Sequence, residues 1–130
     1  MVSLSKSEYE ILSLLWTKPE GLTATEINEL AQIKSWKDAS IHLILNGLLK
    51  KEVIRTEGMV LTGRTYSRVF KATLSPEEYS LLQVKQNAAF VEDKNAVFTN
   101  IFAAFLDDSE VNSETIDKIE KLLDKKRKEL

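Results

Sequence analysis

The sequence predicts a mainly helical protein with one small β-hairpin, and three observations lead to this prediction. In the first half of the chain, apolar residues recur at helical spacing in three short segments. Two β-prone runs follow, separated by the turn residues Thr62-Gly63. From Ser75 onward the helical spacing returns. We therefore expect a winged helix-turn-helix domain over residues 1–74, followed by a C-terminal helical region over residues 75–130.

The composition is that of a folded chain with few groups suited to catalysis. The 130 residues, 43% hydrophobic and 29% charged, fit one ordinary domain or one small domain with a helical addition. With no Cys and one His, the chain lacks a thiolate metal site, and it contains no phosphate-binding loop and no H-E-x-x-H motif. We expect no enzyme, no cofactor and no metal. Since no apolar run reaches membrane-spanning length and the start lacks a signal-peptide pattern, we also expect a cytoplasmic protein without membrane insertion.

Capping patterns place the first two helices. A capping box can begin at Ser5 or at Ser7, ahead of a helix that ends before Pro19. Thr23-x-x-Glu26 is a further capping box, and it begins a second helix of barely three turns. A helix this short is stable only when it packs against other elements.

The third segment has the strongest amphipathic pattern, and we expect its helix to begin after Ser35. The buried stripe follows i, i+3, i+4, i+7, i+8 spacing through Ile41, Ile44, Leu45, Leu48 and Leu49. In a helix-turn-helix, the exposed face of this helix reaches base edges in the major groove of DNA. The candidate base-reading residues on or beside that face are Ala39, Ser40, His42, Leu43 and Asn46.

The hairpin begins where the apolar period changes from near four to near two, after Lys51. Thr62-Gly63 is its expected turn, and Gly58 marks a bulge or a rival turn. A generic α+β domain is the alternative architecture. It does not explain why basic residues gather on the third helix and the hairpin.

Charge is unevenly distributed along the chain. Residues 1–74 contain 10 Lys and Arg against 8 Asp and Glu, whereas residues 75–130 contain 8 against 12. The segment from Lys34 to Lys71 alone has a net charge of +5, which indicates a polyanion-binding face. An ordinary solvated surface is the alternative. The candidate phosphate contacts of the third helix and the wing are Lys34, Lys37, Lys50, Lys51, Arg55, Arg64 and Arg68.

Three further helices are expected in the C-terminal region. Ser75 and Pro76 begin a helix that runs to about Phe90, an apolar run forms the next, and Asn112 caps the last. These helices carry more apolar surface than they can bury alone, which predicts a homodimer; the alternative is that they complete the core of one monomeric domain. The candidate dimer-interface residues are Tyr79, Leu82, Val97, Phe98, Ile101, Phe102, Phe105, Ile116, Ile119, Leu122 and Leu123.

Taken together, these segments resemble the penicillinase repressor family, the winged-helix regulators of β-lactamase and methicillin-resistance operons. The residues that carry the resemblance are Ser7-Glu8-Tyr9-Glu10, Leu14-Leu15-Trp16, Thr23 through Leu30, Ser35-Trp36, Leu48-Leu49-Lys50-Lys51, Gly63-Arg64-Thr65-Tyr66 and Phe105-Leu106-Asp107. The resemblance implies a homodimeric repressor that binds a palindromic operator in double-stranded DNA through the third helix and the wing. It also implies a membrane-bound sensor protease as a partner, because family members are released by cleavage of their C-terminal helices.

The chain departs from the family pattern in the third helix, in a longer wing and at the bond that family members cleave. The family usually has proline, lysine, arginine, threonine and arginine where this chain has Asp38, Ala39, His42, Leu43 and Gly47, so the helix reads a different operator or binds more weakly. The family's cleaved Asn-Phe bond aligns with Ala104-Phe105, so we expect induction without cleavage there. Two alternative functions stay open: a winged-helix protein-interaction module, and a repressor that senses a small ligand in its C-terminal half.

Overall fold

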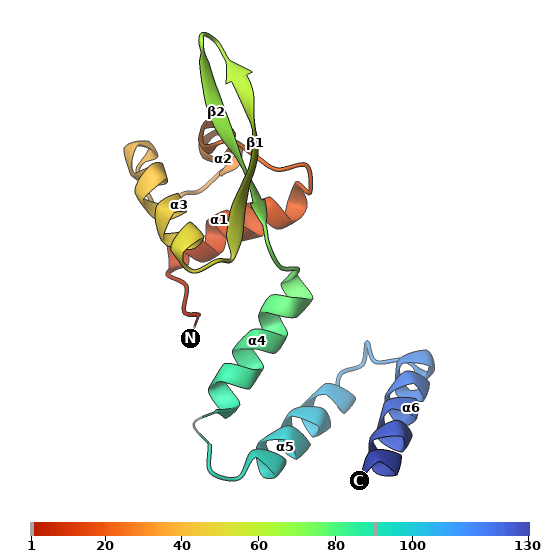
Figure 1. Cartoon of the computed structure of the whole chain (residues 1–130). Coiled ribbons are helices and arrows are strands. Elements are labelled where there is room, and N and C mark those ends of the chain that lie inside the picture. The colour runs from red at the N-terminus through yellow and green to blue at the C-terminus, as the bar shows by residue number, and fades with distance from the viewer. Residues whose placement is uncertain (1, 90) are drawn as a thin grey trace. The chain divides into compact units, whose positions relative to one another are not determined.

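The structure, a computed structural model, describes residues 2–89 and 91–130 and divides into two compact units, Met1–Gln86 and Asn87–Leu130 (Figure 1). The elements are α1 (Lys6–Thr17), α2 (Ala24–Leu30), the 3-10 turn η1 (Asp38–Ser40), α3 (Ile41–Lys50), β1 (Ile54–Thr62), β2 (Thr65–Ala72), α4 (Pro76–Ala88), α5 (Lys94–Leu106) and α6 (Ser113–Glu129). The predicted fold class, mainly helical with a two-stranded wing, is confirmed. The functional division into residues 1–74 and 75–130 stays a prediction.

The starts of the helices follow the local signals in the sequence. Ser5 caps α1 in a capping box with Glu8, and Thr23 caps α2 in the same way with Glu26. Asn112 caps α6 by accepting a hydrogen bond from the backbone of Thr115. The last residue of α4 is Ala88. Its expected end near Phe90 lies outside the described residues.

The expected start of the third helix after Ser35 is wrong. The chain forms the turn η1 first, and α3 begins at Ile41. The side chains ahead of the turn have partners outside the helix: Trp36 Nε1 donates to Asn28 Oδ1 at 2.8 Å, and the Ser35 hydroxyl lies 2.6 Å from that of Ser7. Because these contacts hold residues 35 and 36 away from helical geometry, the helix is shorter than its apolar pattern predicts.

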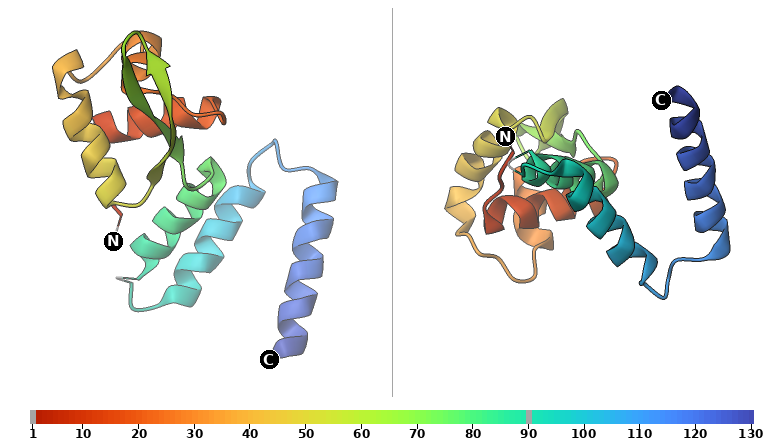
Figure 2. Two further views of the ribbon diagram at one scale, coloured as in Figure 1. Left: turned by 45° about the horizontal axis from the view of Figure 1, so that its top comes forward. Right: turned by 90° about the horizontal axis from the view of Figure 1, so that it is seen from below.

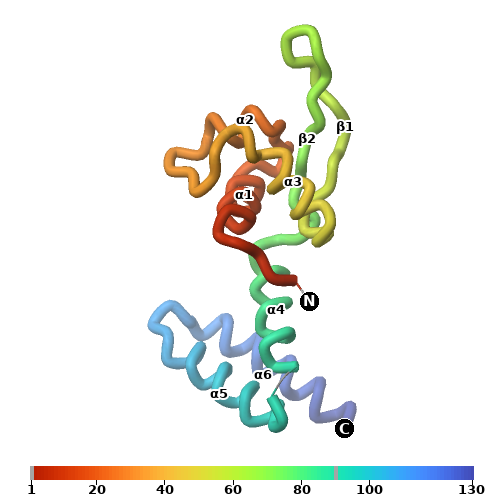
Figure 3. Tube along the Cα trace, turned by 90° about the vertical axis from the view of Figure 1, so that its left-hand side faces the viewer, coloured from red at the N-terminus to blue at the C-terminus, as the bar shows by residue number. Residues whose placement is uncertain are grey.

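The wing is an antiparallel hairpin that extends past the three helices (Figure 1). Its turn lies at Gly63, whose φ of +63° suits a residue without a Cβ atom. Gly58 lies at the register shift between Thr56 and Met59, so it marks a bulge and not a rival turn. Figure 3 shows how far the tip of the hairpin stands from α1.

An isolated β-bridge joins the wing to the segment ahead of α2. Leu22 exchanges backbone hydrogen bonds with Phe70 at 3.0 and 2.8 Å. Gly21 permits this approach, since a Cβ atom there would lie 2.5 Å from a methyl carbon of Val69, and its φ is +91°. The core of the unit is continuous from the helices to the base of the wing, and it consists of Ile11, Leu12, Leu15, Leu22, Ala24, Ile27, Trp36, Ile41, Leu45, Leu48, Val53, Ile54 and Phe70.

Two sets of contacts hold the first turns of α4 against the winged-helix core. The rings of Tyr9, Trp16 and Tyr79 lie 5.8 to 6.0 Å apart, and Trp16 Nε1 donates to the carbonyl of Leu74 at 2.8 Å. The N-terminal residues lie beside the end of α3 (Figure 2). Lys51 Nζ donates to the Ser3 carbonyl at 2.6 Å and holds this segment in place.

The second unit contains α5 and α6, and residues 107–112 reverse the chain between them (Figure 1). Asp93 caps α5 through a hydrogen bond from the backbone of Ala96. Neither helix has a buried residue, and Phe98, Phe102 and Phe105 of α5 are 41%, 50% and 61% exposed. Within the described residues, none of the helices is long and apolar enough to cross a membrane.

Candidate nucleic-acid interface

Helix α3 has one buried and one exposed face, as its spacing predicts. Ile41, Leu45 and Leu48 are buried in the core. On the other side, His42 and Asn46 are exposed, and the side chain of Leu43 is 78% exposed. An apolar side chain this exposed on a helix is available for contact with another molecule.

Two of the five base-reading candidates do not lie on α3. Ala39 and Ser40 belong to the turn η1, where Ala39 is exposed and Ser40 is half-buried. The face that the helix itself presents is therefore carried by His42, Leu43 and Asn46. The sequence pattern missed this division because the turn and the helix share one apolar period.

The basic residues fall into two groups, and the first group is neutralised inside the unit. Lys51 Nζ contacts the Glu8 carboxylate at 2.6 Å. Arg55 contacts the Glu57 carboxylate at 2.5 Å, and Lys71 reaches the same carboxylate at 3.2 Å. Lys34 pairs with Asp38 and also donates to the Asn28 carbonyl at 3.2 Å. Three of the seven phosphate candidates, Lys34, Lys51 and Arg55, thus already hold an acidic partner.

These ion pairs lower the pKa values of the two acids, Glu8 and Glu57. Burial raises the pKa of the Glu8 carboxyl, but hydrogen bonds from Lys51 and from Ser5 outweigh it, and the net pKa lies below the ordinary value of 4.5. Hydrogen bonds from Arg55, and then from Lys71, lower the pKa of the exposed Glu57. Both acids are therefore ionised near neutral pH and keep their basic partners occupied.

The second group has no acidic partner within the part of the chain that the structure describes. It contains Lys37 ahead of η1, Lys50 at the end of α3, Arg64 in the turn of the wing and Arg68 on β2, all exposed. The guanidinium of Arg68 lies 5.1 Å from the centre of the Phe70 ring, a cation–π contact that orients it. The unneutralised charge therefore lies at the two ends of the α3 region and along the wing.

A cleft of about 380 Å³ joins the helix to the wing. His42 of α3 lines it together with Tyr66 and Arg68 of β2, Met59 of β1 and Thr25 of α2. The structure thus brings one base-reading candidate and one phosphate candidate to the same cleft. Guanidinium and hydroxyl groups are common phosphate ligands in protein–DNA complexes.

The sequence predicts apolar, β-prone residues in the wing but does not say which of them are exposed. Met59, Val60, Leu61 and Tyr66 are 59%, 44%, 60% and 68% exposed. Only Ile54 and Phe70, near the base, are buried in the wing. The hairpin extends beyond the helices, so the apolar side chains of its outer half have no core to pack against (Figure 1).

The candidate dimer-interface residues lie in different environments. Tyr79 packs with Tyr9 and Trp16 inside its own unit, where burial raises the pKa of its hydroxyl, and Leu82 is half-buried. On α5, Val97 and Ile101 are half-buried and the phenylalanines are exposed. On α6, Ile116, Leu122 and Leu123 are exposed and Ile119 is half-buried.

Comparison with known families decides the class of this protein. The sequence profile of the penicillinase repressor family matches residues 4–125. The chain belongs to this family. It is therefore a winged-helix transcription regulator that binds DNA, and not an enzyme.

Solved structures of Staphylococcus aureus proteins resemble the chain at low identity. MepR, a transcription regulator of the multidrug efflux pump MepA, is 16% identical over 98% of this chain and 80% of its own, with a TM-score of 0.43. A MepR mutant bound to an oligodeoxyribonucleotide is 16% identical over 97% and 79%, with a TM-score of 0.46. MarR in complex with salicylate and kanamycin is 13% identical over 95% and 71%, with a TM-score of 0.40. No curated protein matches the sequence.

Proposed function

We propose that this protein is a homodimeric repressor whose α3 and wing bind a palindromic operator. The observation that carries the proposal is the coincidence of the unneutralised basic residues with the exposed face of α3 and with the wing. DNA phosphates attract such residues irrespective of sequence. Base edges are then available to the side chains between them.

The proposal gives the candidate residues separate roles. His42, Leu43 and Asn46 face the bases, and Asn46 has the amide geometry for a bidentate contact with adenine. Lys37, Lys50, Arg64 and Arg68 contact phosphates and position the helix. Residues 1–74 form the DNA-binding part, and residues 75–130 form the dimerisation part.

Dimerisation is supported by the character of α5. Its sequence, Lys94–Leu106, is apolar on nearly every side, and none of its residues is buried. Helices of this kind occur where neighbours cover their apolar sides. A second copy of the chain supplies such neighbours and, by its two-fold symmetry, matches a palindromic site.

The salt dependence of DNA binding tests the proposed interface through two arginines of the same hairpin. Arg64 has no acidic partner among the described residues, whereas Arg55 is held by Glu57. We expect Arg64→Ala to reduce the slope of log affinity against log salt by about one, the value for one lost phosphate contact. Arg55→Ala, the matched control, leaves that slope unchanged.

Fluorescence anisotropy with a site selected from random DNA gives the slopes at several salt concentrations. Equal slopes for wild type and both variants would place the interface elsewhere. An affinity for DNA that does not fall with salt at all would favour the protein-interaction module instead.

A further inference from the structure

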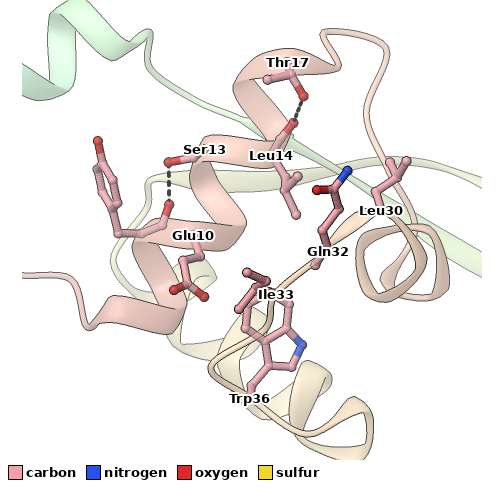
Figure 4. Close-up of a pocket in the computed structure, with 10 residues that line it drawn as sticks. Glu10, Ser13, Leu14, Thr17, Leu30, Gln32, Ile33 and Trp36 are labelled. Carbon is pink, nitrogen blue, oxygen red and sulfur yellow. Dashed lines mark hydrogen bonds between the residues drawn. The ribbon is translucent and has the colours of Figure 1, made fainter.

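An apolar groove of about 490 Å³ opens between α1 and the segment that joins α2 to α3 (Figure 4). Its size is in the range of small-molecule sites. No residue that we assign to DNA contact lines it. The groove therefore calls for an explanation other than operator binding.

The surface of the groove is mainly apolar, and the hydroxyl groups of Ser13 and Thr17 in its lining already donate to backbone carbonyls. Leu14, Leu30, Ile33 and Trp36 converge around the opening (Figure 4). The Ser13 hydroxyl donates to the Tyr9 carbonyl at 2.8 Å, and the Thr17 hydroxyl donates to the Leu14 carbonyl at 2.7 Å. A ligand here consequently meets hydrocarbon and aromatic surface, with few free donors.

Two aliphatic side chains at the mouth of the groove are exposed to water. Ile33 is 90% exposed and Leu30 is 43% exposed. Exposed aliphatic residues gathered at the rim of an apolar groove are typical of a surface that another molecule covers. Their burial by a ligand supplies a hydrophobic contribution to binding.

The groove has one kind of charge. Glu10 is the only charged residue among those that line it, and it lies at one edge (Figure 4). Its Oε2 accepts hydrogen bonds from the Ser35 hydroxyl at 2.9 Å and from the Ser35 backbone at 3.3 Å, which fix the carboxylate in place. Its other oxygen has no hydrogen-bond partner in the described part of the chain. Trp36, which is 8% exposed, also lines the groove, and an indole ring attracts cations.

We propose that this groove is a binding site for a small apolar cation. The apolar walls bury the body of the ligand, and Glu10 together with the Trp36 ring attracts its positive charge. An apolar anion of the same shape lacks this attraction and meets the carboxylate instead. Of two ligands with the same shape, the site therefore binds the cation more tightly than the anion.

The binding site also touches the segment that leads into α3. Trp36 is joined to Asn28 by a 2.8 Å hydrogen bond, and Asn28 Nδ2 donates to the Asp38 carbonyl at 3.2 Å. A ligand seated on Trp36 therefore stabilises the connection between α2 and η1. Bound ligand should raise the melting temperature in proportion to its occupancy.

The test uses a pair of probes with the same shape and opposite charge, tetraphenylphosphonium and tetraphenylborate, titrated by calorimetry into the full-length protein. We expect saturable binding of one tetraphenylphosphonium per chain, and binding of tetraphenylborate that is about tenfold weaker or absent. Glu10→Gln keeps the hydrogen bond from Ser35 but removes the charge, and it should weaken the cation about fivefold. Ile33→Ser should weaken it by a similar factor, about fivefold, because it removes apolar contact.

Matched controls separate the groove from other apolar surface. Glu77→Gln removes an exposed acid from the first turn of α4, and Leu81→Ser removes an exposed leucine from the same helix. Neither residue lines the groove, so neither change should alter the affinity for tetraphenylphosphonium. Equal binding of the two probes, or binding that Glu10→Gln and Ile33→Ser leave unchanged, would overturn the proposal. No DNA is present in the experiment, so its outcome is independent of the proposed repressor function.

Discussion

The two compact units bury very different shares of their apolar residues. In Met1–Gln86, a core runs from α1 through α3 to the base of the wing, and Ile11, Leu12, Ile27, Leu45 and Leu48 are fully buried. In Asn87–Leu130, Ala88 is the one buried residue among those that the structure describes. Both units are nevertheless rich in aliphatic and aromatic side chains.

This difference shows that helical content and stability are separate properties of a sequence. The first unit has helices with one apolar face each, and a single layer of neighbours covers such a face. Helix α5 is apolar on nearly all sides, so a single neighbouring helix covers only part of it. The first unit buries a core of its own, whereas the second leaves the apolar side chains of α5 and α6 unburied, which supports the proposed dimerisation.

The largest expected effect comes from placing a charge on α5. Phe102→Asp puts a carboxylate into the proposed dimer interface, where its desolvation opposes association. We expect sedimentation to change from a dimer of about twice 14.8 kDa to a monomer. The affinity for a two-half-site operator should fall by about 100-fold, because the two halves no longer bind together.

Asn100→Asp is the control for this change, since it adds the same charge to an exposed polar position of α5. It should remain a dimer. If the wild-type protein is a monomer at micromolar concentration, the second unit is not a dimerisation region and the proposal fails.

The next effect concerns the exposed face of α3. Asn46→Ala should cost ~1–3 kcal/mol on the selected operator and relax the base preference at one position in each half-site, with half-sites about one helical turn apart. Lys50→Ala, on the same helix, should weaken binding to operator and random DNA alike. Binding isotherms on both DNAs distinguish the two patterns. If Asn46→Ala weakens the affinity for operator and random DNA equally, Asn46 does not contact bases, and the wing becomes the better candidate for base contacts.

A smaller effect is expected from the ion pair between Lys51 and Glu8, which belongs to the first unit. Lys51→Met should lower the free energy of unfolding by about 1–2 kcal/mol near neutral pH, since it leaves the buried Glu8 carboxylate without its cation. Chemical denaturation measures this value. Lys50→Met, which removes an exposed lysine without an acidic partner in the described part of the chain, should change it little.

The same pair predicts a pH dependence. The pKa of Glu8 is lowered in the folded state, so its contribution to stability is present above the ordinary value of 4.5 and is lost as the pH falls through the folded-state pKa. Denaturation of wild type and Glu8→Gln as the pH falls toward that range should therefore show converging stabilities. Parallel curves would assign the stabilisation to another acid.

The last prediction is that the chain is not cleaved between Ala104 and Phe105 during induction. Ala104 and Phe105 lie within α5, and the resemblance found from the sequence aligns Ala104 with the asparagine of a cleaved bond. We expect induction to proceed without a cut between them. Mass spectrometry of the protein from induced cells should find the intact chain, and a fragment that ends at Ala104 would contradict this expectation.

Features that depend on neighbouring residues follow from the amino-acid sequence alone. The caps at Thr23 and Asn112 and the hairpin turn at Gly63 involve residues no more than three positions apart and were predicted, and Ser5 was one of two caps predicted for the first helix. The buried stripe of α3 was predicted as well. Local hydrogen bonds and side-chain periodicity are sufficient for these features because they do not require knowledge of any distant contact.

Which basic residues are free of acidic partners depends on how distant elements pack. Lys50 and Lys51 are adjacent and chemically identical, yet Lys51 lies against Glu8, a residue 43 positions away, while Lys50 is exposed. The start of α3 was decided in the same way, by the contact of Trp36 with Asn28. Such pairings depend on how separate elements pack, and the energy of an ion pair changes with distance and burial in a way that no local pattern records.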